Sequence, residues 1–446
     1  MSTLHLEHSR VTKALTDNSD IDFAEAERRL RATHVVVLTE GADLSSPAAL
    51  WCVLTALNAS RRTFGSATLV LTFDVPLQRA LPGAITLAMA ARLMGATVVR
   101  SVPEHATHVI CVGTALESAA FCVRCWWNGW LAGIRPSWDP APAQAAWNPL
   151  AGIVAAAIAV REVFANVRGI RSSPRATTLS LWEPWCDPGA ASPGPHVVHG
   201  IRALWLIGLG HLGQGIGWSL SALPMAGRIA LQDDQAAGIE NEATGLVTWS
   251  TDVGRRKTRI AAGWLEHFGW ETDLIERRFG ADTSASITDP PVVVTALDSP
   301  APRQHVHAAS FAYMVDIGVG HGPVDFESGQ LRVFARGDPA NWQAAAGSKN
   351  IDRLLQRPAY EQVASKDRCG AFELADASVA VPFVGAAMGA LAVAQLARLG
   401  AMEPAIRLMQ IELGAPDMAS CGAMAAAPLG NLGTVEMDLR GACTRL

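Results

Sequence analysis

Three glycines in the second half of the chain have the spacing of a phosphate-binding turn. Gly208, Gly210 and Gly213 form G-L-G-H-L-G between the apolar run LWLI and a segment of helical character. Glycine permits a tight turn from strand to helix and lets backbone N–H groups face a phosphate at the helix N-terminus. Asp233 follows about 20 residues later, the usual spacing of an acid that binds ribose. A nucleotide site is therefore predicted, with an NAD-dependent oxidoreductase and a turn without ligand as alternatives.

The residues that follow Asp233 favour ATP over NAD. Asn241 lies in a polar turn, Lys257 ends the run DVGRRK, and Asp298 follows the apolar run VVVTAL. Activation of a carboxylate by ATP requires cations near the phosphates, and lysine supplies one. An aspartate is a hard oxygen ligand that suits Mg²⁺, whereas hydride transfer needs neither group at these positions. A solvated Lys257 and a capping Asp298 are the alternatives.

This order of motifs resembles the adenylation domain shared by ubiquitin-activating enzymes and the ThiF and MoeB family. In that family a glycine-rich turn, an acid, an Asn-containing turn, G-x-x-K and a strand ending in A-x-D follow one another, and about residues 200–400 match this order. The resemblance implies that Asp233 binds the ATP ribose and that Asn241 and Lys257 contact the phosphates. It further implies that Asp298 holds Mg²⁺, so ATP and Mg²⁺ are the expected cofactors.

One further position agrees with the family pattern, and several depart from it. Arg303 stands where the family commonly has an arginine, and it is assigned to the nucleotide site on that ground. Gln235 replaces the second acid of the family's D-x-D, unless a shifted register places Asp234 there. Thr244 and Gly245 replace an Arg-Gln pair whose arginine would contact phosphate. Three alternatives follow: a lower affinity for ATP, an inactive relative, or a substitute arginine. The candidate substitutes are Arg255, Arg256 or one from the first half, such as Arg61 or Arg62.

Cys369 precedes a glycine-rich apolar helix, a place where the family commonly has a cysteine. In members that form a thioester, a cysteine attacks the acyl adenylate, because a thiolate is strongly nucleophilic. The resemblance therefore implies that Cys369 is the catalytic nucleophile, with a structural cysteine as the alternative. Cys122 and Cys125 form a C-x-x-C without a second such pair, so we expect a structural role for them and no zinc site.

Three histidines lie near the predicted motifs. His211 is inside the glycine turn, and His305 and His307 follow Asp298. They could line the site, or they could serve only in local turns.

Strands and helices alternate in both halves, which predicts an α/β fold with mainly parallel sheets. Residues 184–195 contain four prolines and two glycines, so they mark a linker. We expect residues 1–180 and 200–446 to form two Rossmann-like adenylation domains joined by residues 181–199, with the cysteine segment near 345–370. The first half lacks a G-x-G-x-x-G motif after HVVVL, so it is expected to be the inactive domain and the second half the active one.

Composition limits the classes of partner. The 446 residues carry 36 basic and 41 acidic side chains, a net charge of −5, which does not favour nucleic acid. Eight cysteines form no disulfide scaffold, and the first residues show no secretory signal, so a reducing cytoplasm is expected. The uncharged stretch from Ala377 to Ala397 is long enough to span a bilayer, but its Ala and Gly content and early proline favour a buried core helix, so we expect no membrane.

The resemblance therefore implies ATP-dependent adenylation of the C-terminal carboxylate of a ubiquitin-like protein, followed by a thioester on Cys369 and transfer to a conjugating-enzyme-like partner. A fused inactive–active pair is similar to activating enzymes of bacterial ubiquitin-like conjugation operons that serve antiphage defence. The alternatives are a ThiF- or MoeB-like adenylyltransferase for a sulfur carrier or peptide that forms no thioester, and a catalytically inactive scaffold. Assembly as a homodimer stays open.

Overall fold

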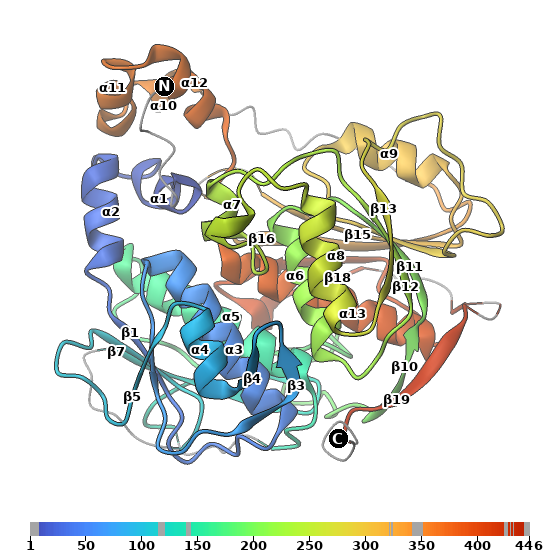
Figure 1. Ribbon diagram of the computed structural model, residues 1–446, viewed down its shortest axis with the longest axis horizontal. Coiled ribbons are helices and arrows are strands. Elements are labelled where there is room, and N and C mark those ends of the chain that lie inside the picture. The colour runs from blue at the N-terminus through green and yellow to red at the C-terminus, as the bar shows by residue number, and fades with distance from the viewer. Residues whose placement is uncertain are drawn as a thin grey trace.

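The computed structural model describes residues 9–114, 121–139, 144–320, 322, 324–340, 351–422, 427–428, 430 and 432–440. It is a mixed α/β structure with two large sheets that are rich in parallel strands (Figure 1). The prediction of α/β architecture is confirmed at this level. The division into an inactive and an active half stays a prediction.

The first sheet has the strand order β5-β2-β1-β6-β7-β8-β9. The five strands from β5 to β7 are parallel, and β8 and β9 are antiparallel additions. Its strands are β1 (Val35–Leu38), β2 (Thr68–Val70), β5 (Thr97–Val99), β6 (His108–Cys111), β7 (Phe121–Asn128), β8 (Leu131–Pro136) and β9 (Thr177–Ser180). Strands β7 and β8 were not predicted from the sequence.

The second sheet has the strand order β13-β12-β11-β14-β15-β16-β17-β18. Its first five strands are again parallel, and the last three are antiparallel. The strands are β11 (Ala203–Ile207), β12 (Arg228–Gln232), β13 (Glu271–Ile275), β14 (Val292–Thr295), β15 (Tyr313–Val319), β16 (Ser328–Ala335), β17 (Leu408–Glu412) and β18 (Ser420–Cys421). The parallel parts of both sheets therefore place their first strand in the centre.

Four helices pack between the two sheets: α3 (Pro47–Phe64), α5 (Pro149–Val167), α6 (His211–Ala222) and α13 (Pro382–Gly400). Helices α5 and α13 are apolar and long enough to cross a membrane, but 89% and 100% of their apolar windows are buried against the rest of the protein. The prediction of a buried core helix near Ala377–Ala397 is thus confirmed. The apolar surface of each helix is covered mainly by the other helices of this layer.

The remaining helices surround this layer (Figure 1). They are α1 (Ser9–Thr16), α2 (Phe23–Arg31), α4 (Leu87–Leu93), α7 (Glu240–Thr244), α8 (Lys257–His267), α9 (Pro300–Ala308), α10 (Ile351–Leu355), α11 (Pro358–Ala364) and α12 (Arg368–Asp376). Helices α10 to α12 lie beside α1 and α2, and Phe23 of α2 packs on Tyr360 of α11. Lys13, Asp17 and Tyr360 form a buried polar cluster that ties α1 to α11.

Two predicted helices are shorter than expected, and glycine explains both differences. The segment ALPGAITLAMAARL by itself predicts a helix, but β3 (Pro76–Leu81) and β4 (Ala84–Thr86) form a hairpin before α4, with Gly83 at φ +80° in its turn. The residues from Thr251 to Phe268 likewise predict one helix, but α8 begins only at Lys257. Gly254 has φ +87°, which a right-handed helix cannot contain.

The proline-rich stretch 181–199 contacts helix α13 and the turn between β7 and β8. Trp182 is buried, and the Arg398 guanidinium of α13 lies 4.9 Å from its ring centroid. On the side of the first sheet, Trp130 Nε1 donates a hydrogen bond to the Pro195 carbonyl at 2.7 Å. Its last residues enter β10 (Val197–Ile201), which pairs with β19 (Thr434–Asp438). The domain boundary placed here stays a prediction.

Candidate functional site

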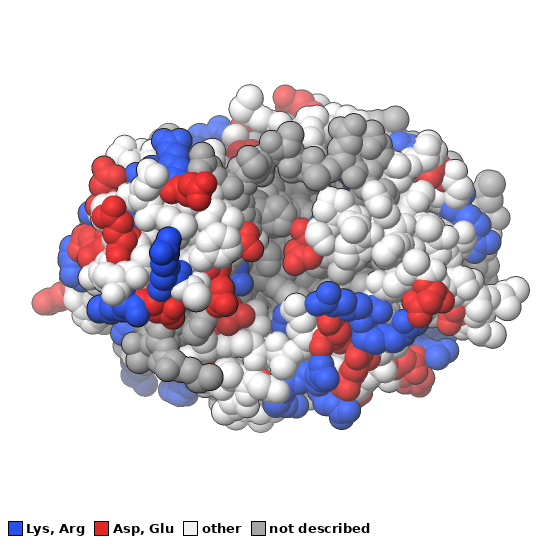
Figure 2. Space-filling model, turned by 90° about the horizontal axis from the view of Figure 1, so that it is seen from above, with Lys and Arg blue, Asp and Glu red and all other residues white. Residues whose placement is uncertain are grey.

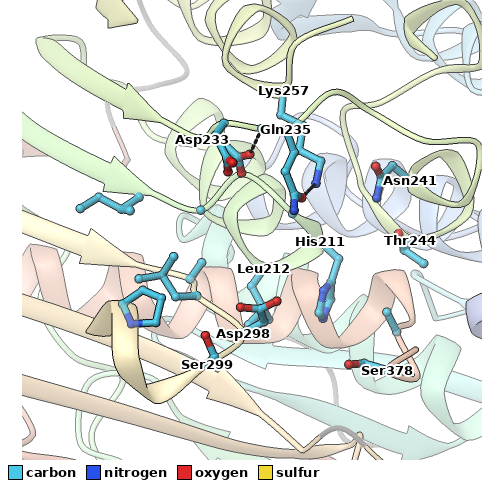
Figure 3. Close-up of a pocket in the computed structure, with 18 of the residues that line it drawn as sticks. His211, Leu212, Asp233, Gln235, Asn241, Thr244, Lys257, Asp298, Ser299 and Ser378 are labelled. Carbon is cyan, nitrogen blue, oxygen red and sulfur yellow. Dashed lines mark hydrogen bonds between the residues drawn. The ribbon is translucent and has the colours of Figure 1, made fainter. Parts of the chain in front are cut away.

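A cavity of about 560 Å³ lies at the carboxyl ends of β11, β12, β14 and β15. Strands β12 and β14 flank β11 on opposite sides, so the chain leaves β11 at the point where the strand order reverses. Open parallel sheets bind ligands at such a point, because the connections on either side diverge and leave a crevice. Most of the predicted site residues line this cavity (Figure 3).

The three glycines of the turn have separate roles. Gly208 has φ +87°, and Gly213 packs so tightly that a Cβ atom there would lie 2.0 Å from the Gly208 carbonyl oxygen. Gly210 caps α6, lines the cavity, and has nothing within 4 Å of where a Cβ atom would stand. The turn is therefore tight because of Gly208 and Gly213 and open towards the cavity at Gly210, and the N-terminus of α6 faces that space.

Asp233 connects the glycine turn to the following loop. Its carboxylate accepts the Leu209 N–H at 2.8 Å and the Gln235 N–H at 2.8 Å. Gln235 in turn accepts a hydrogen bond from Lys257 Nζ at 2.7 Å, and Lys257 begins α8 with only 8% of its surface exposed. Figure 3 shows these three side chains grouped at one side of the cavity. They bring an acid and a buried cation to adjacent places, as ribose and phosphate binding would require.

Asn241 and Thr244 belong to α7 at another wall of the cavity. Asn241 Oδ1 accepts the Gly238 N–H at 2.9 Å, which fixes the turn before α7. At Gly245 a Cβ atom would lie 2.2 Å from Gln214 Oε1, so the Gln214 side chain from α6 occupies the space of a side chain at position 245. The departure from the family pattern at this position is therefore matched by a glutamine from a different element.

Asp298 is exposed in the turn between β14 and α9 and lines the cavity together with Ser299 (Figure 3). Arg303 also lines it, but its guanidinium donates hydrogen bonds to the carbonyls of Leu297 and Ile317. It also pairs with Asp316 at 3.4 Å. Burial raises the pKa of the Asp316 carboxyl, and Arg303 opposes that shift. Arg303 thus fastens the turn that carries Asp298 to β15.

The structure adds three arginines that sequence analysis did not assign. Arg277 and Arg278 follow β13, and Arg278 pairs with Asp234 at 2.8 Å. Their position at the carboxyl end of the next parallel strand was the available signal. Arg10 reaches the cavity from α1 and donates to the Ser378 carbonyl at 3.1 Å. Burial lowers the pKa of Arg10, and Glu240 and Asp376 oppose the shift. No local sequence pattern marks Arg10, because tertiary packing alone brings α1 here.

The arginines proposed as substitutes for the missing one do not line the cavity. Arg62 is buried and donates to the carbonyls of Glu242 and Thr248, and Arg61 pairs with Glu242 at 3.2 Å. Arg61 and Arg62 therefore hold α7 and the segment that follows it, and neither is among the residues that line the cavity. Arg255 pairs with Asp252, and Arg256 binds the Asp234 carbonyl. Arg10 is the first-half arginine that lies in the lining.

Cys369 lies on α12, is exposed, and is not among the residues that line the cavity. In this part of the chain, the residues that line the cavity are Ser378, Val379 and Ala380, which follow α12. His211 lines the cavity, whereas His305 and His307 lie on α9 outside the lining. Part of the expected cysteine segment, residues 345–350, lies outside the described residues.

The C-x-x-C pair lies on β7, where a spacing of three turns the two side chains to opposite faces of the sheet. Cys122 Sγ lies 3.4 Å from Cys111 Sγ, and Cys125 contacts Cys52 of α3. The two thiols therefore cannot serve as ligands of one metal ion, and both pack in the interior.

Comparisons with known proteins agree with the motif order. Residues 34–181 match the model of the BilD N-terminal domain, and residues 202–402 match that of the BilD C-terminal domain. A bacterial E1-like protein BilD from Collimonas sp. (strain OK412) is 30% identical over 422 residues, which cover 89% of this chain and 88% of that protein.

Solved structures of E. coli MccB are also similar. One matches with 14% identity and a TM-score of 0.36, over 52% of this chain and 64% of MccB. Another, with MccA present, has 15% identity and a TM-score of 0.35, over 52% of this chain and 66% of that one. From the domain matches and the Collimonas relative, the chain belongs to the BilD family of bacterial E1-like proteins.

Proposed function

We propose that this chain adenylates the C-terminal carboxylate of a ubiquitin-like protein with ATP. The carboxylate oxygen would attack the α-phosphorus, the bond to the β-phosphate would break, and pyrophosphate would leave. The observation that carries the proposal is the cavity that joins the glycine turn, Asp233, Lys257 and Asp298 in a member of an E1-like family. The arginines and Lys257 that line it would balance the charges of two anions held together.

The residues fit a magnesium nucleotide. Asp298 supplies one carboxylate, and among the described residues no group of three or more His, Cys, Asp or Glu side chains could hold a metal ion. Mg²⁺ usually takes one or two carboxylates and completes its shell with phosphates and water. We therefore assign Asp298 to Mg²⁺, which would neutralise phosphate charge. Asp233 is assigned to the ribose, and Asn241 and Lys257 to the phosphates.

In the second step of the proposed reaction, the Cys369 thiolate attacks the acyl adenylate. A thioester forms, the bond to phosphate breaks, and AMP leaves. A conjugating-enzyme-like partner would then receive the acyl group. Because Cys369 is outside the cavity lining, this step requires the α10–α12 segment or the adenylate to move. The same observation favours the second candidate, an adenylyltransferase that forms no thioester.

The test is ATP–pyrophosphate exchange with a panel of bacterial ubiquitin-like proteins as candidate carriers. We expect exchange to be lost in Asp298→Ala, retained in Cys369→Ala, and unaffected in Asp352→Ala and Cys186→Ala, whose side chains lie outside the cavity lining. A reducible adduct with the carrier should form in the wild type and not in Cys369→Ala. Exchange without a reducible adduct in the wild type supports the adenylyltransferase that forms no thioester, and an adduct that persists in Cys369→Ala places the thioester on another cysteine. Absence of exchange with every carrier would leave an inactive scaffold.

A further inference from the structure

The buried ammonium of Lys257 has an unusual partner for a lysine. Its Nζ atom donates to Gln235 Oε1 at 2.7 Å, and Gln235 is a neutral amide. The Lys257 backbone N–H also donates to the Gln235 carbonyl oxygen at 3.1 Å, so the backbone and the side chain of the lysine both form hydrogen bonds with Gln235. Lys257 is 8% exposed, and its exposed part faces the cavity. Buried lysines are usually paired with an acid.

Nearby acids are directed elsewhere. Asp233 accepts two backbone N–H groups, from Leu209 and Gln235. Asp234 pairs with Arg278 at 2.8 Å. The Gln235 backbone N–H donates to Asp233, which holds the Gln235 backbone beside the cavity, and the side-chain amide oxygen accepts from Lys257 (Figure 3). The neutral amide of Gln235 therefore positions the Lys257 ammonium without neutralising its charge.

We infer that Gln235 is a positioning residue that determines how strongly the site binds the triphosphate of its nucleotide. The inference rests on the proposed function and deepens it. The amide keeps the Lys257 ammonium in place while leaving its full charge available to a phosphate. An acid at position 235 would form an ion pair with Lys257, and an incoming phosphate would have to compete with that pair in a partly desolvated site.

The isosteric variant Gln235→Glu tests this inference, because it changes the charge with little change in shape. The full-length protein is titrated with a non-hydrolysable ATP analogue, with AMP and with adenosine, and binding is followed by calorimetry. We expect at least a tenfold weaker Kd for the ATP analogue and an unchanged Kd for adenosine. In exchange assays, KM for ATP should rise by a similar factor and kcat should change less.

Three further variants separate charge from packing. Gln362→Glu adds the same charge on the exposed surface of α11 and should bind as the wild type does. Gln235→Leu removes the acceptor without adding charge and should weaken binding less than Gln235→Glu. In a Lys257→Met background, adding Gln235→Glu should cost little more, because the ion pair cannot form.

Failure of the inference about Gln235 and failure of the proposed function give different binding results. Equal losses in Gln235→Leu and Gln235→Glu, or an additive loss in the double variant, would overturn the inference while leaving nucleotide binding intact. Wild-type affinity in Gln235→Glu would also overturn it. If the wild type binds neither the ATP analogue nor adenosine, the proposed function itself fails. Thermal unfolding of each variant identifies losses that come from misfolding.

Discussion

At the scale of single residues, some side chains of the site form hydrogen bonds and ion pairs within the protein that stabilise the fold around the cavity. Arg303 was assigned to the nucleotide by resemblance, yet its guanidinium is engaged by two backbone carbonyls and by Asp316. Asp316 is 2% exposed, and it also accepts the Thr295 hydroxyl at 2.6 Å. Arg303 therefore acts on Asp298 through the intervening turn.

Removing Arg303 should destabilise the protein. Arg303→Met removes the cation that pairs with the buried Asp316 carboxyl and leaves only the weaker influence of Arg332, which we expect to cost about 3 kcal/mol of unfolding free energy. Adding Asp316→Asn should restore much of this loss, since the neutral amide needs no cation. Chemical denaturation monitored by tryptophan fluorescence measures both. A stable Arg303→Met variant that only binds nucleotide less well would instead support direct contact with the nucleotide.

At the scale of elements, helices α6 and α13 approach each other through glycines. A Cβ atom at Gly215 would lie 1.8 Å from the Gly385 carbonyl oxygen, and one at Gly389 would lie 2.2 Å from the Gly215 backbone. This crossing fixes α6, and α6 begins at the glycine turn of the cavity. The position of the turn thus depends on a helix from a distant part of the sequence.

Gly215→Ala should therefore lower the melting temperature, because the methyl group meets backbone atoms that cannot move independently. Gly217→Ala, in the same helix with nothing within 4 Å, is the matched control. It should be neutral or stabilising by up to about 1 kcal/mol, the helix propensity difference between alanine and glycine. Equal melting temperatures for the two variants would contradict the close crossing.

The contact between β6 and α5 makes stability depend on pH. His108 bonds to Thr107 Oγ1 at 2.8 Å and to Asn166 Oδ1 at 2.9 Å, and burial lowers its pKa. The unfolded chain therefore takes up a proton first as pH falls. Stability should be full above the unfolded pKa of about 6.5 and should decrease as pH falls through that value.

Unfolding at pH 7.5 and pH 5.5 measures this dependence. His108→Gln should remove part of the difference between the two pH values. His105→Gln, which changes an exposed residue in the turn before β6, should leave the difference unchanged. An identical pH dependence in wild type and His108→Gln would exclude His108 as its source.

At the scale of the whole molecule, the two sheets are joined by a helical layer and by buried charges. Arg161 of α5 pairs with Glu327, next to β16, at 2.7 Å and with Glu162 at 2.8 Å. Arg168 lies 3.7 Å from Glu327. Figure 2 shows that exposed charges of both signs are interspersed on one face of the molecule, in contrast to this buried network.

Breaking this network should weaken the association of the two sheets. We expect Arg161→Met to lower the unfolding free energy by about 3 kcal/mol, because Glu327 and Glu162 lose their shared cation in a buried position. Arg175→Met, which breaks a half-exposed pair with Asp417, should cost at most about 1 kcal/mol. Similar losses in the two variants would show that the buried network does not couple the sheets.

The sequence by itself determined the local features of this protein. The apolar runs predicted strands β1, β11, β12 and β14, and the glycine turn, Asp233, Lys257 and Asp298 were located by their spacing relative to those strands. The strand predictions are confirmed, because strand ends and glycine turns depend on nearby residues. The roles assigned to Asp233, Lys257 and Asp298 stay predictions, although all three line the cavity.

Tertiary structure alone decided the rest. Arg10 belongs to the cavity, while Arg61 and Arg62 support the segment after α7. Likewise Gln214 occupies the space beside Gly245, and the lysine's partner is a neutral amide. These contacts join residues far apart in the chain. Their energies depend on burial and on distance in space, and neither quantity can be read from spacing along the sequence.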